Sequence, residues 1–212
     1  LGLEKRRDNE VVARLFSSYD EFLEFMKRDV GDKPWSAYAS QSLNAIVLYS
    51  DESDTTLKHT LFHECSHQYL ARYTTAAPKW FNEGLSEYFE GWRIDDGEEF
   101  VVRPALYDLI VLQTALKKGE YLKLGQLLAL APTEFVEFAE RNPKLHPALH
   151  YATSWGLVYY FLELAPPAER ELLRQYIRDL NQKGAKADQA AVAVADWDAF
   201  EVGWKAAILA LK

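Results

Sequence analysis

Residues 63–67 read His-Glu-Cys-Ser-His, and this pentapeptide constrains the fold more than any other stretch of the chain. Residues four apart lie on the same face of an α-helix. A helical pattern covers residues 54–73, so His63 and His67 can direct two imidazole nitrogens at one metal ion. Glu64 projects beside them, where it can take a proton from water. The H-E-x-x-H pattern therefore predicts a zinc site on a helix.

A catalytic zinc site needs a third protein ligand and an open fourth position. Glu83 follows His67 by 16 positions, after a break at Pro78, which cannot continue a helix. It stands near the start of a second helix predicted over residues 80–92. Two antiparallel helices joined by this turn would bring Glu83 opposite the histidine pair. Glu87 shares the face of Glu83 and is predicted to accept a hydrogen bond from the non-ligating nitrogen of one histidine.

Other interpretations of these residues stay open at this level. The motif arises by chance in roughly one such sequence per hundred, and the two glutamates can be ordinary solvent-facing helix residues. His59, one turn before His63, is predicted to be a neighbour and not a ligand. Cys65 points off the ligand face and is predicted to be a small buried apolar residue.

Composition limits the class of protein. With 49% hydrophobic and 14% aromatic residues, the 212-residue chain is expected to form one domain, or two small lobes that share a cleft. The net charge of −8 and pI near 5.2 argue against nucleic acid or an anionic membrane as partner, since either requires a basic face. No apolar run reaches the roughly 18–20 residues that a membrane span needs.

The order of predicted elements indicates an α+β fold with a small N-terminal β-sheet and a largely helical C-terminal half. Strands are predicted over residues 11–16, 36–39 and 45–49, with a further hairpin turning at Asp96 and Gly97. Helices are predicted over residues 104–118, 122–130, 132–141, 151–164, 167–183 and 195–211. The last helix carries an apolar stripe predicted to pack on the core: Trp197, Phe200, Trp204, Ile208 and Leu211. We expect a sublobe of residues 1–103 with the zinc-binding helices and a helical sublobe of residues 104–212 that completes the cleft, together forming one compact unit.

These motifs resemble the gluzincin metallopeptidases, the group that contains thermolysin and the aminopeptidase N family. H-E-x-x-H is followed by W-F-N-E-G-L-S-E at residues 80–87 and by Y-A-T-S-W-G-L-V-Y-Y-F-L at residues 151–162. This combination is similar to small bacterial proteins of the peptidase MA-like superfamily. The resemblance covers about residues 10–165, and its specific part is some thirty positions.

The resemblance implies a gluzincin-like catalytic core with one zinc ion per chain. By this likeness His63, His67 and Glu83 are the zinc ligands, Glu64 is the general base, and Glu87 braces a histidine ligand. The interval between His67 and Glu83 is short for the group.

A peptidase must also stabilise the negative oxygen that forms on the scissile carbonyl. Tyr151, with Gly156 downstream, resembles the tyrosine that precedes a glycine-containing helix in the aminopeptidase N family, although the spacing differs from that pattern. Tyr151 is therefore a catalytic candidate, and His150 is a second possible donor. Alternatively, both residues pack or cap the start of a helix.

The resemblance further implies that a peptide substrate lies antiparallel to an edge strand. Residues 44–50 are the predicted strand, with Ala45, Ile46 and Val47 at its centre. The chain has a single methionine, Met26, and lacks the G-x-M-E-N motif with which aminopeptidases of the group hold the free amine, which favours an endopeptidase.

The sequence therefore predicts a zinc metallopeptidase that acts on peptides or proteins. The family likeness implies a bacterial protein, exported or attached to the cell envelope, whose upstream signal or anchor has been removed. Two alternatives remain: a zinc-binding scaffold with a relic active site, and a hydrolase of non-peptide amides.

Overall fold

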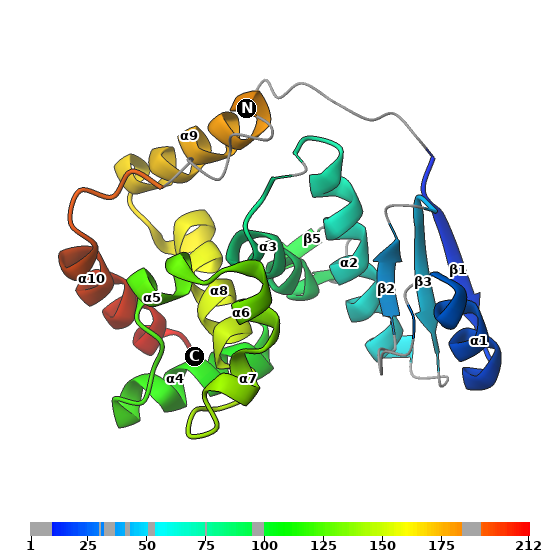
Figure 1. Cartoon of the computed structure of the whole chain (residues 1–212). Coiled ribbons are helices and arrows are strands. Elements are labelled where there is room, and N and C mark those ends of the chain that lie inside the picture. Colours follow the sequence, from blue (N-terminus) through cyan, green and yellow to red (C-terminus); the bar gives the residue numbers. More distant parts are fainter. Residues whose placement is uncertain are drawn as a thin grey trace.

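A small β-sheet and a larger helical body make up the fold (Figure 1). The computed structural model describes residues 10–29, 31, 37–40, 43–50, 54–74, 76–94, 100–183 and 192–212. The sheet with its outer helix forms one side of the molecule, and the helix of residues 54–71 lies between the sheet and the helical body. The predicted α+β class, with a small N-terminal sheet and a largely helical C-terminal half, is confirmed.

The sheet has three strands in the order β1-β3-β2. They are β1 (Val12–Phe16), β2 (Ala37–Ser40) and β3 (Ala45–Tyr49). β3 pairs in parallel with β1 and antiparallel with β2. The predicted strand over 45–49 has the expected bounds, and the other two each begin one residue later than predicted.

The prediction that Ala45, Ile46 and Val47 form an edge strand is wrong, because β3 is hydrogen-bonded to a neighbour on both sides. The first four residues of β3 are buried. An unbroken apolar run is typical of a strand that is covered on both faces. β2, which pairs only with β3 among the described strands, is an edge strand.

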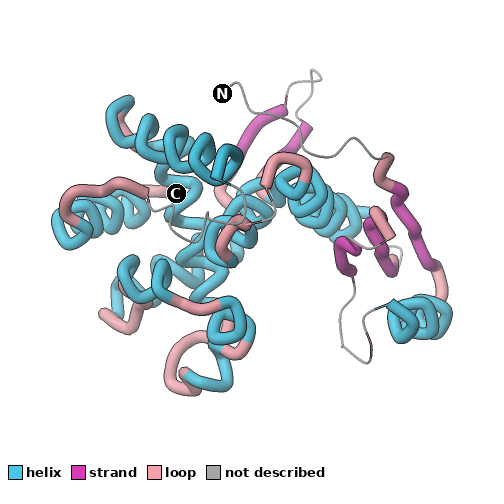
Figure 2. Tube along the Cα trace, turned by 45° about the horizontal axis from the view of Figure 1, so that its top comes forward, coloured by secondary structure: helices cyan, strands magenta, loops and turns pink. Residues whose placement is uncertain are grey.

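Two helices enclose the sheet (Figure 2). They are α1 (Tyr19–Asp29) and α2 (Asp54–Ala71). α1 buries Phe22 and Met26 completely in a cluster with Tyr38 and Val47. On the other face, the buried Gln68 of α2 donates hydrogen bonds to the carbonyl oxygen of Ser40, at 3.1 Å, and to that of Ala45, at 3.3 Å. This side chain ties the helix that carries the histidine motif to both β2 and β3.

The helical body is built around two helices that pack closely, α3 (Lys79–Glu90) and α8 (Leu149–Tyr159). A Cβ atom on Gly84 would lie 2.5 Å from the carbonyl oxygen of Ser154, so only glycine permits this approach. The remaining elements are β4 (Trp92–Ile94), β5 (Phe100–Val102), α4 (Leu106–Lys118), α5 (Leu124–Ala129), α6 (Pro132–Val136), α7 (Phe138–Arg141), the π-helix η1 (Tyr160–Leu164), α9 (Pro167–Lys183) and α10 (Trp197–Ala210).

Most predicted helices are present with small shifts at their ends. The helix predicted over residues 132–141 is interrupted at Glu137, and the one over 151–164 starts at Leu149 and finishes as a π-helix. The hairpin of β4 and β5 is confirmed, while its predicted turn lies outside the described residues. The apolar stripe of α10 packs as predicted: Trp204 and Ile208 are fully buried.

The larger hydrophobic cluster extends from the end of α2 through α3 to α10 and thus crosses the position 103/104, where the two sublobes were predicted to meet. The smaller cluster holds the sheet and α1 together. α3 belongs to the larger cluster, and α2 packs against α3 on one side and against β2 and β3 on the other, so a site on these two helices is supported from both sides. Among the described residues, no helix is both long and apolar enough to cross a membrane.

Candidate metal centre

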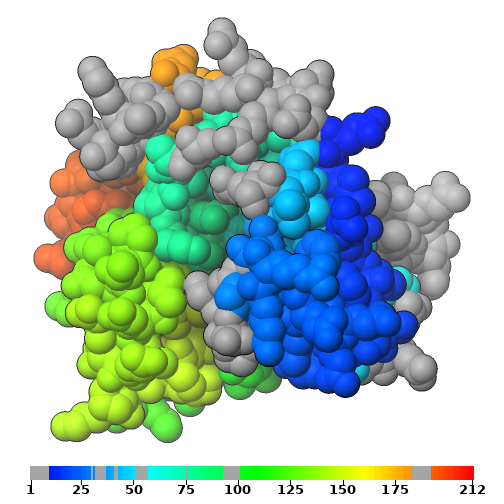
Figure 3. All heavy atoms as spheres, turned by 45° about the vertical axis from the view of Figure 1, so that its right-hand side comes forward, coloured from blue at the N-terminus to red at the C-terminus, as the bar shows by residue number. Residues whose placement is uncertain are grey.

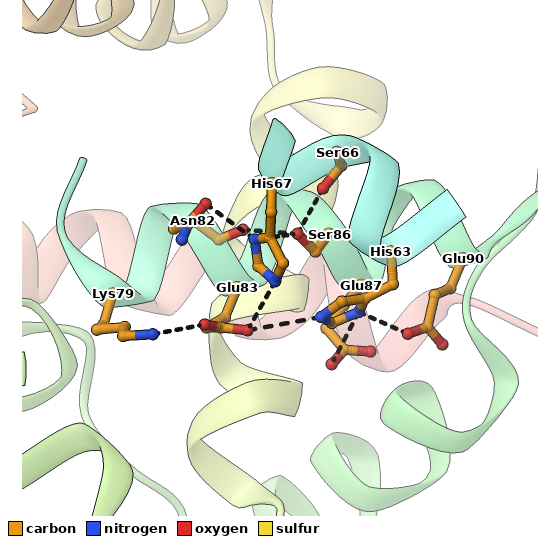
Figure 4. Close-up of polar contacts among 9 residues, drawn as sticks. All are labelled: His63, Ser66, His67, Lys79, Asn82, Glu83, Ser86, Glu87 and Glu90. Carbon is orange, nitrogen blue, oxygen red and sulfur yellow. Dashed lines mark hydrogen bonds and ion pairs between the residues drawn. The ribbon is translucent and has the colours of Figure 1, made fainter. Parts of the chain in front are cut away.

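The histidine motif occupies the middle of α2, as its spacing predicts. His63 and His67 are one turn apart, with ring centroids separated by 4.8 Å. The chain turns after α2, and Pro78, in an extended conformation, precedes the first residue of α3. α3 packs against α2, which brings Glu83 opposite the two imidazoles (Figure 4).

The three predicted ligands converge on one point. The Oε2 atom of Glu83 lies 3.6 Å from the Nε2 atom of His63 and 3.6 Å from the Nε2 atom of His67. Nitrogen and oxygen ligands at 2.0–2.1 Å from a tetrahedral zinc ion lie roughly 3.3 Å apart. His63, His67 and Glu83 can therefore hold a metal ion with small adjustments of their side chains.

The other nitrogen of each imidazole has an acceptor. The Nδ1 atom of His63 lies 2.7 Å from the Oε1 atom of Glu90. The Nδ1 atom of His67 lies 3.0 Å from the side-chain oxygen of Asn82 and 3.0 Å from the hydroxyl oxygen of Ser86. Acceptors at Nδ1 favour the tautomer with the proton on that atom, which leaves the Nε2 lone pair of each ring for a metal.

Glu90, which the sequence interpretation missed, takes the position predicted for Glu87. The Oε1 atom of Glu87 is 3.8 Å from the Nδ1 atom of His63, beyond hydrogen-bond distance. Burial, followed by the charges of Asp108 and Glu90, raises the pKa of Glu87 well above its usual value. Glu90 is seven residues after Glu83 and shares its helix face, so the same periodicity could have identified it. Nothing in the sequence around Asp108, which comes from α4, predicts its position beside Glu87.

The charges of the three candidate ligands depend on one another. Burial by itself would lower the pKa of His63, but hydrogen bonds to Glu83 and Glu90 outweigh it and raise the pKa to about 11. Burial lowers the pKa of His67. Against the effect of its burial, His63, His67 and Lys79 lower the pKa of Glu83 to about 2. A divalent cation would compete with the proton on His63, since a ligating imidazole must be neutral.

Glu64 lies beside the ligands and is buried. Burial is the main cause that raises its pKa to about 7. Its carboxylate accepts a hydrogen bond from the backbone of Ala39, which places it next to β2. Glu64 therefore contacts both the histidine helix and the edge strand of the sheet.

A cleft of about 570 Å³ opens over the triad. Its walls include Ala37, Tyr38 and Ala39 of β2 on one side, with Val136 of α6 and Tyr151 of α8 as further lining residues. Figure 3 shows the sheet side in blue and the segment of α6 and α7 in yellow-green on either side of this part of the surface. The described lining residues on α2 and α3 are His63, Glu64, His67, Gln68, Lys79, Asn82 and Glu83.

The two candidate donors at the start of α8 occupy different environments. Tyr151 lines the cleft, and burial together with Glu83 and Glu87 raises the pKa of its hydroxyl. His150 is buried between the rings of Phe135 and Phe138, with centroid distances of 4.6 Å to each, and burial lowers its pKa to about 4. His150 is absent from the described lining of the cleft, which corresponds to the packing alternative for this residue.

Two other residues of α2 complete the comparison with the sequence. The prediction that Cys65 is buried is wrong: its position, two residues from each histidine, faces solvent. His59 belongs to neither of the His/Glu groups that could hold a metal among the described residues.

Comparison with known proteins adds no assignment. No model of a protein family matches the chain, and a search of curated proteins finds no match. The chemistry of the centre has to be inferred from its own residues.

Proposed function

We propose that this protein is a zinc-dependent peptidase of the gluzincin type, which hydrolyses peptide bonds in the cleft between β2 and α6. One observation carries the proposal: His63, His67 and Glu83 converge on one point in a cleft that Glu64 also lines. Two imidazole nitrogens and one carboxylate oxygen are a donor set typical of catalytic zinc.

Four residues of α2 and α3 have two proposed roles, metal binding and proton transfer. His63, His67 and Glu83 would hold the zinc ion, which when bound supplies a Lewis acid for a carbonyl oxygen and lowers the pKa of water. Glu64 takes a proton from water and passes it to the leaving amine, as a general base and then a general acid. Its bond to the backbone of Ala39 positions its carboxylate between the ligands and β2.

β2 replaces β3 as the proposed strand for substrate binding. Ala37, Tyr38 and Ala39 line the cleft, and β2 has no second partner among the described strands. An extended peptide can add to such an edge through main-chain hydrogen bonds. This arrangement places the peptide alongside Glu64, which bonds to the same strand.

Tyr151 is the proposed donor to the oxygen of the scissile carbonyl. Its side chain lines the cleft, and its raised pKa keeps the hydroxyl protonated, as a hydrogen-bond donor must be. His150 is not part of this proposal, because it lies in the core between two phenylalanine rings.

The open cleft supports an enzyme over a zinc-stabilised scaffold. A relic site has no need for access to solvent, whereas a cleft of about 570 Å³ lies over the triad. As in the sequence interpretation, we favour an endopeptidase, since the chain lacks the aminopeptidase G-x-M-E-N motif. Hydrolysis of a non-peptide amide would use the same groups, so the substrate screen must include such compounds.

The test combines metal analysis with digestion of a peptide library by wild-type protein and by Glu64→Gln. We expect about one zinc ion per chain in both proteins. Peptide cleavage should fall by about 10²–10⁴-fold in the variant, because the proton carrier is lost while the ligands remain. Glu120→Gln, at an exposed position after α4, is the matched control. A metal-free wild-type protein, or a Glu64→Gln protein as active as the wild type, would contradict the proposal.

A further inference from the structure

A lysine side chain lies in the cleft beside the candidate ligands. Lys79 is the only Lys or Arg among the described lining residues. Its Nζ atom lies 3.0 Å from the Oε1 atom of Glu83, while the other carboxylate oxygen of Glu83 faces His63 and His67 (Figure 4). Lys79 therefore occupies the side of Glu83 that is turned away from the imidazoles.

The ammonium group of Lys79 has unused donors. It carries three N–H groups and no acceptor. Within the described part of the chain its one hydrogen-bond partner is Glu83. The side chain is 37% exposed in the cleft, so its remaining N–H groups can reach a ligand.

Asn82 adds a second donor on the same face of α3, three residues after Lys79. Its side-chain oxygen accepts a hydrogen bond from the Nδ1 atom of His67, which sets the orientation of the amide. Figure 4 shows the amide nitrogen turned away from His67. Among the described residues this nitrogen has no hydrogen-bond partner, and Asn82 lines the cleft.

We propose that Lys79 and Asn82 form a subsite that binds a carboxylate of the peptide substrate next to the scissile bond. The inference rests on the proposed peptidase function and gives it a substrate class. The carboxylate has two possible sources, an acidic side chain near the scissile bond and the C-terminus of the peptide. A charge-assisted bond to the ammonium and a neutral bond to the amide together select a carboxylate over a neutral amide.

Neutralisation of Glu83 alone does not account for the position of Lys79. The carboxylate of Glu83 already faces two imidazoles through its other oxygen. A carboxylate that binds beside the triad, and not on the metal ion itself, needs a charged donor of its own. Lys79 provides one in the part of the cleft where the described lining holds no other Lys or Arg.

The experiment measures binding, so that it does not depend on turnover. Zinc-loaded Glu64→Gln protein is titrated with short acetylated alanine peptides that carry one Glu or one Gln at successive interior positions. Each peptide is made with a free and with an amidated C-terminus. We expect at least one peptide with a carboxylate to bind about tenfold more tightly than its neutral counterpart. The peptide pair that shows the difference identifies the source of the carboxylate.

Variants of Lys79, made in the Glu64→Gln protein, test whether this side chain causes the preference for a carboxylate. Lys79→Met should abolish the tenfold difference, Lys79→Arg should retain it, and Lys117→Met, at an exposed position near the end of α4, should leave it unchanged. Zinc content is measured for each variant, because Lys79 contacts Glu83. Equal binding of charged and neutral peptides, or a preference that persists in Lys79→Met, overturns the subsite.

The two proposals fail in different ways. If the wild-type protein cleaves no peptide but shows the Lys79-dependent preference in binding, the peptidase function is contradicted and the carboxylate subsite stands. Cleavage of peptides by the wild type without any preference in the titrations contradicts the subsite and leaves the peptidase.

Discussion

α3 has two faces with different tasks. One face carries the polar groups that meet the histidines of α2, namely Asn82, Glu83, Ser86, Glu87 and Glu90. The opposite face packs into the large hydrophobic cluster with Phe81, Leu85, Tyr88 and Phe89.

The apolar face of α3 fixes where the helix lies, and its polar face provides the groups of the candidate centre. The apolar face and Gly84 hold the helix at a fixed distance from its neighbours, since burial and close packing supply most of the stabilisation of a helix in a protein. The polar face carries the side chains that would hold a metal ion and accept protons from the two histidines. Changes on the two faces should therefore affect different measurements.

The largest effect on stability is expected from Phe81→Ala. Phe81 is 1% exposed and packs against the rings of Trp80 and Tyr176, at centroid distances of 5.5 Å. Its removal leaves a cavity, and the free energy of unfolding of the metal-free protein should fall by about 3–5 kcal/mol. Denaturant unfolding measures this loss. The zinc affinity of the folded fraction should stay close to that of the wild type, and a large loss of affinity would contradict the separation of the two faces.

A smaller loss of stability is expected from Gly84→Ala. The added methyl group would meet the backbone of Ser154, which cannot move without displacing α8, and we expect a loss of about 1–3 kcal/mol. Gly125→Ala in α5 is the matched control. A Cβ atom there meets nothing within 4 Å, so this variant should be unchanged or up to about 1 kcal/mol more stable. Equal stability of the two variants would show that α3 and α8 are not in close contact at Gly84.

The smallest change in folding stability, with a clear change in metal binding, is expected from Glu90→Gln. Loss of the carboxylate that accepts from His63 should weaken zinc binding by about 10–100-fold, the usual effect of removing such a partner. Competition with a chelator measures it. Glu87→Gln is the matched comparison and should have the smaller effect, since Glu87 lies 3.8 Å from the same nitrogen. A larger effect of Glu87→Gln would restore Glu87 as the brace of His63.

Much of the candidate centre could be predicted because its residues obey local geometry. The spacing of His63 and His67 on a helix, and the position of Glu83 after Pro78, indicate all three candidate ligands by periodicity and one turn. Glu90 follows the same periodicity and was missed because only Glu87 was considered for the role.

Other features of the site depend on elements far apart in the chain and could not be predicted from helix periodicity or turns. Asp108 approaches Glu87 from α4, and nothing in the sequence around it indicates that contact. The predicted edge strand was wrong for a similar reason: β1 pairs with β3 in parallel, so β2 and not β3 is the edge strand that borders the cleft. The exposure of Cys65 likewise depends on which face of α2 is covered by other elements.

The sequence by itself determined the α+β class, the helices that carry the motif, and the shared face of His63 and His67, because residues three to four apart on a helix share a face whatever the rest of the chain does. The break at Pro78 suggested the return of Glu83, and the packing of α3 on α2 decided it. Only the tertiary structure decided which strand borders the cleft, that His150 is enclosed by two phenylalanine rings while Tyr151 is not, and that Lys79 and Asn82 direct donors into the cleft. These outcomes depend on how elements far apart in the chain pack against one another, and packing between distant elements leaves no periodic signal in a single sequence.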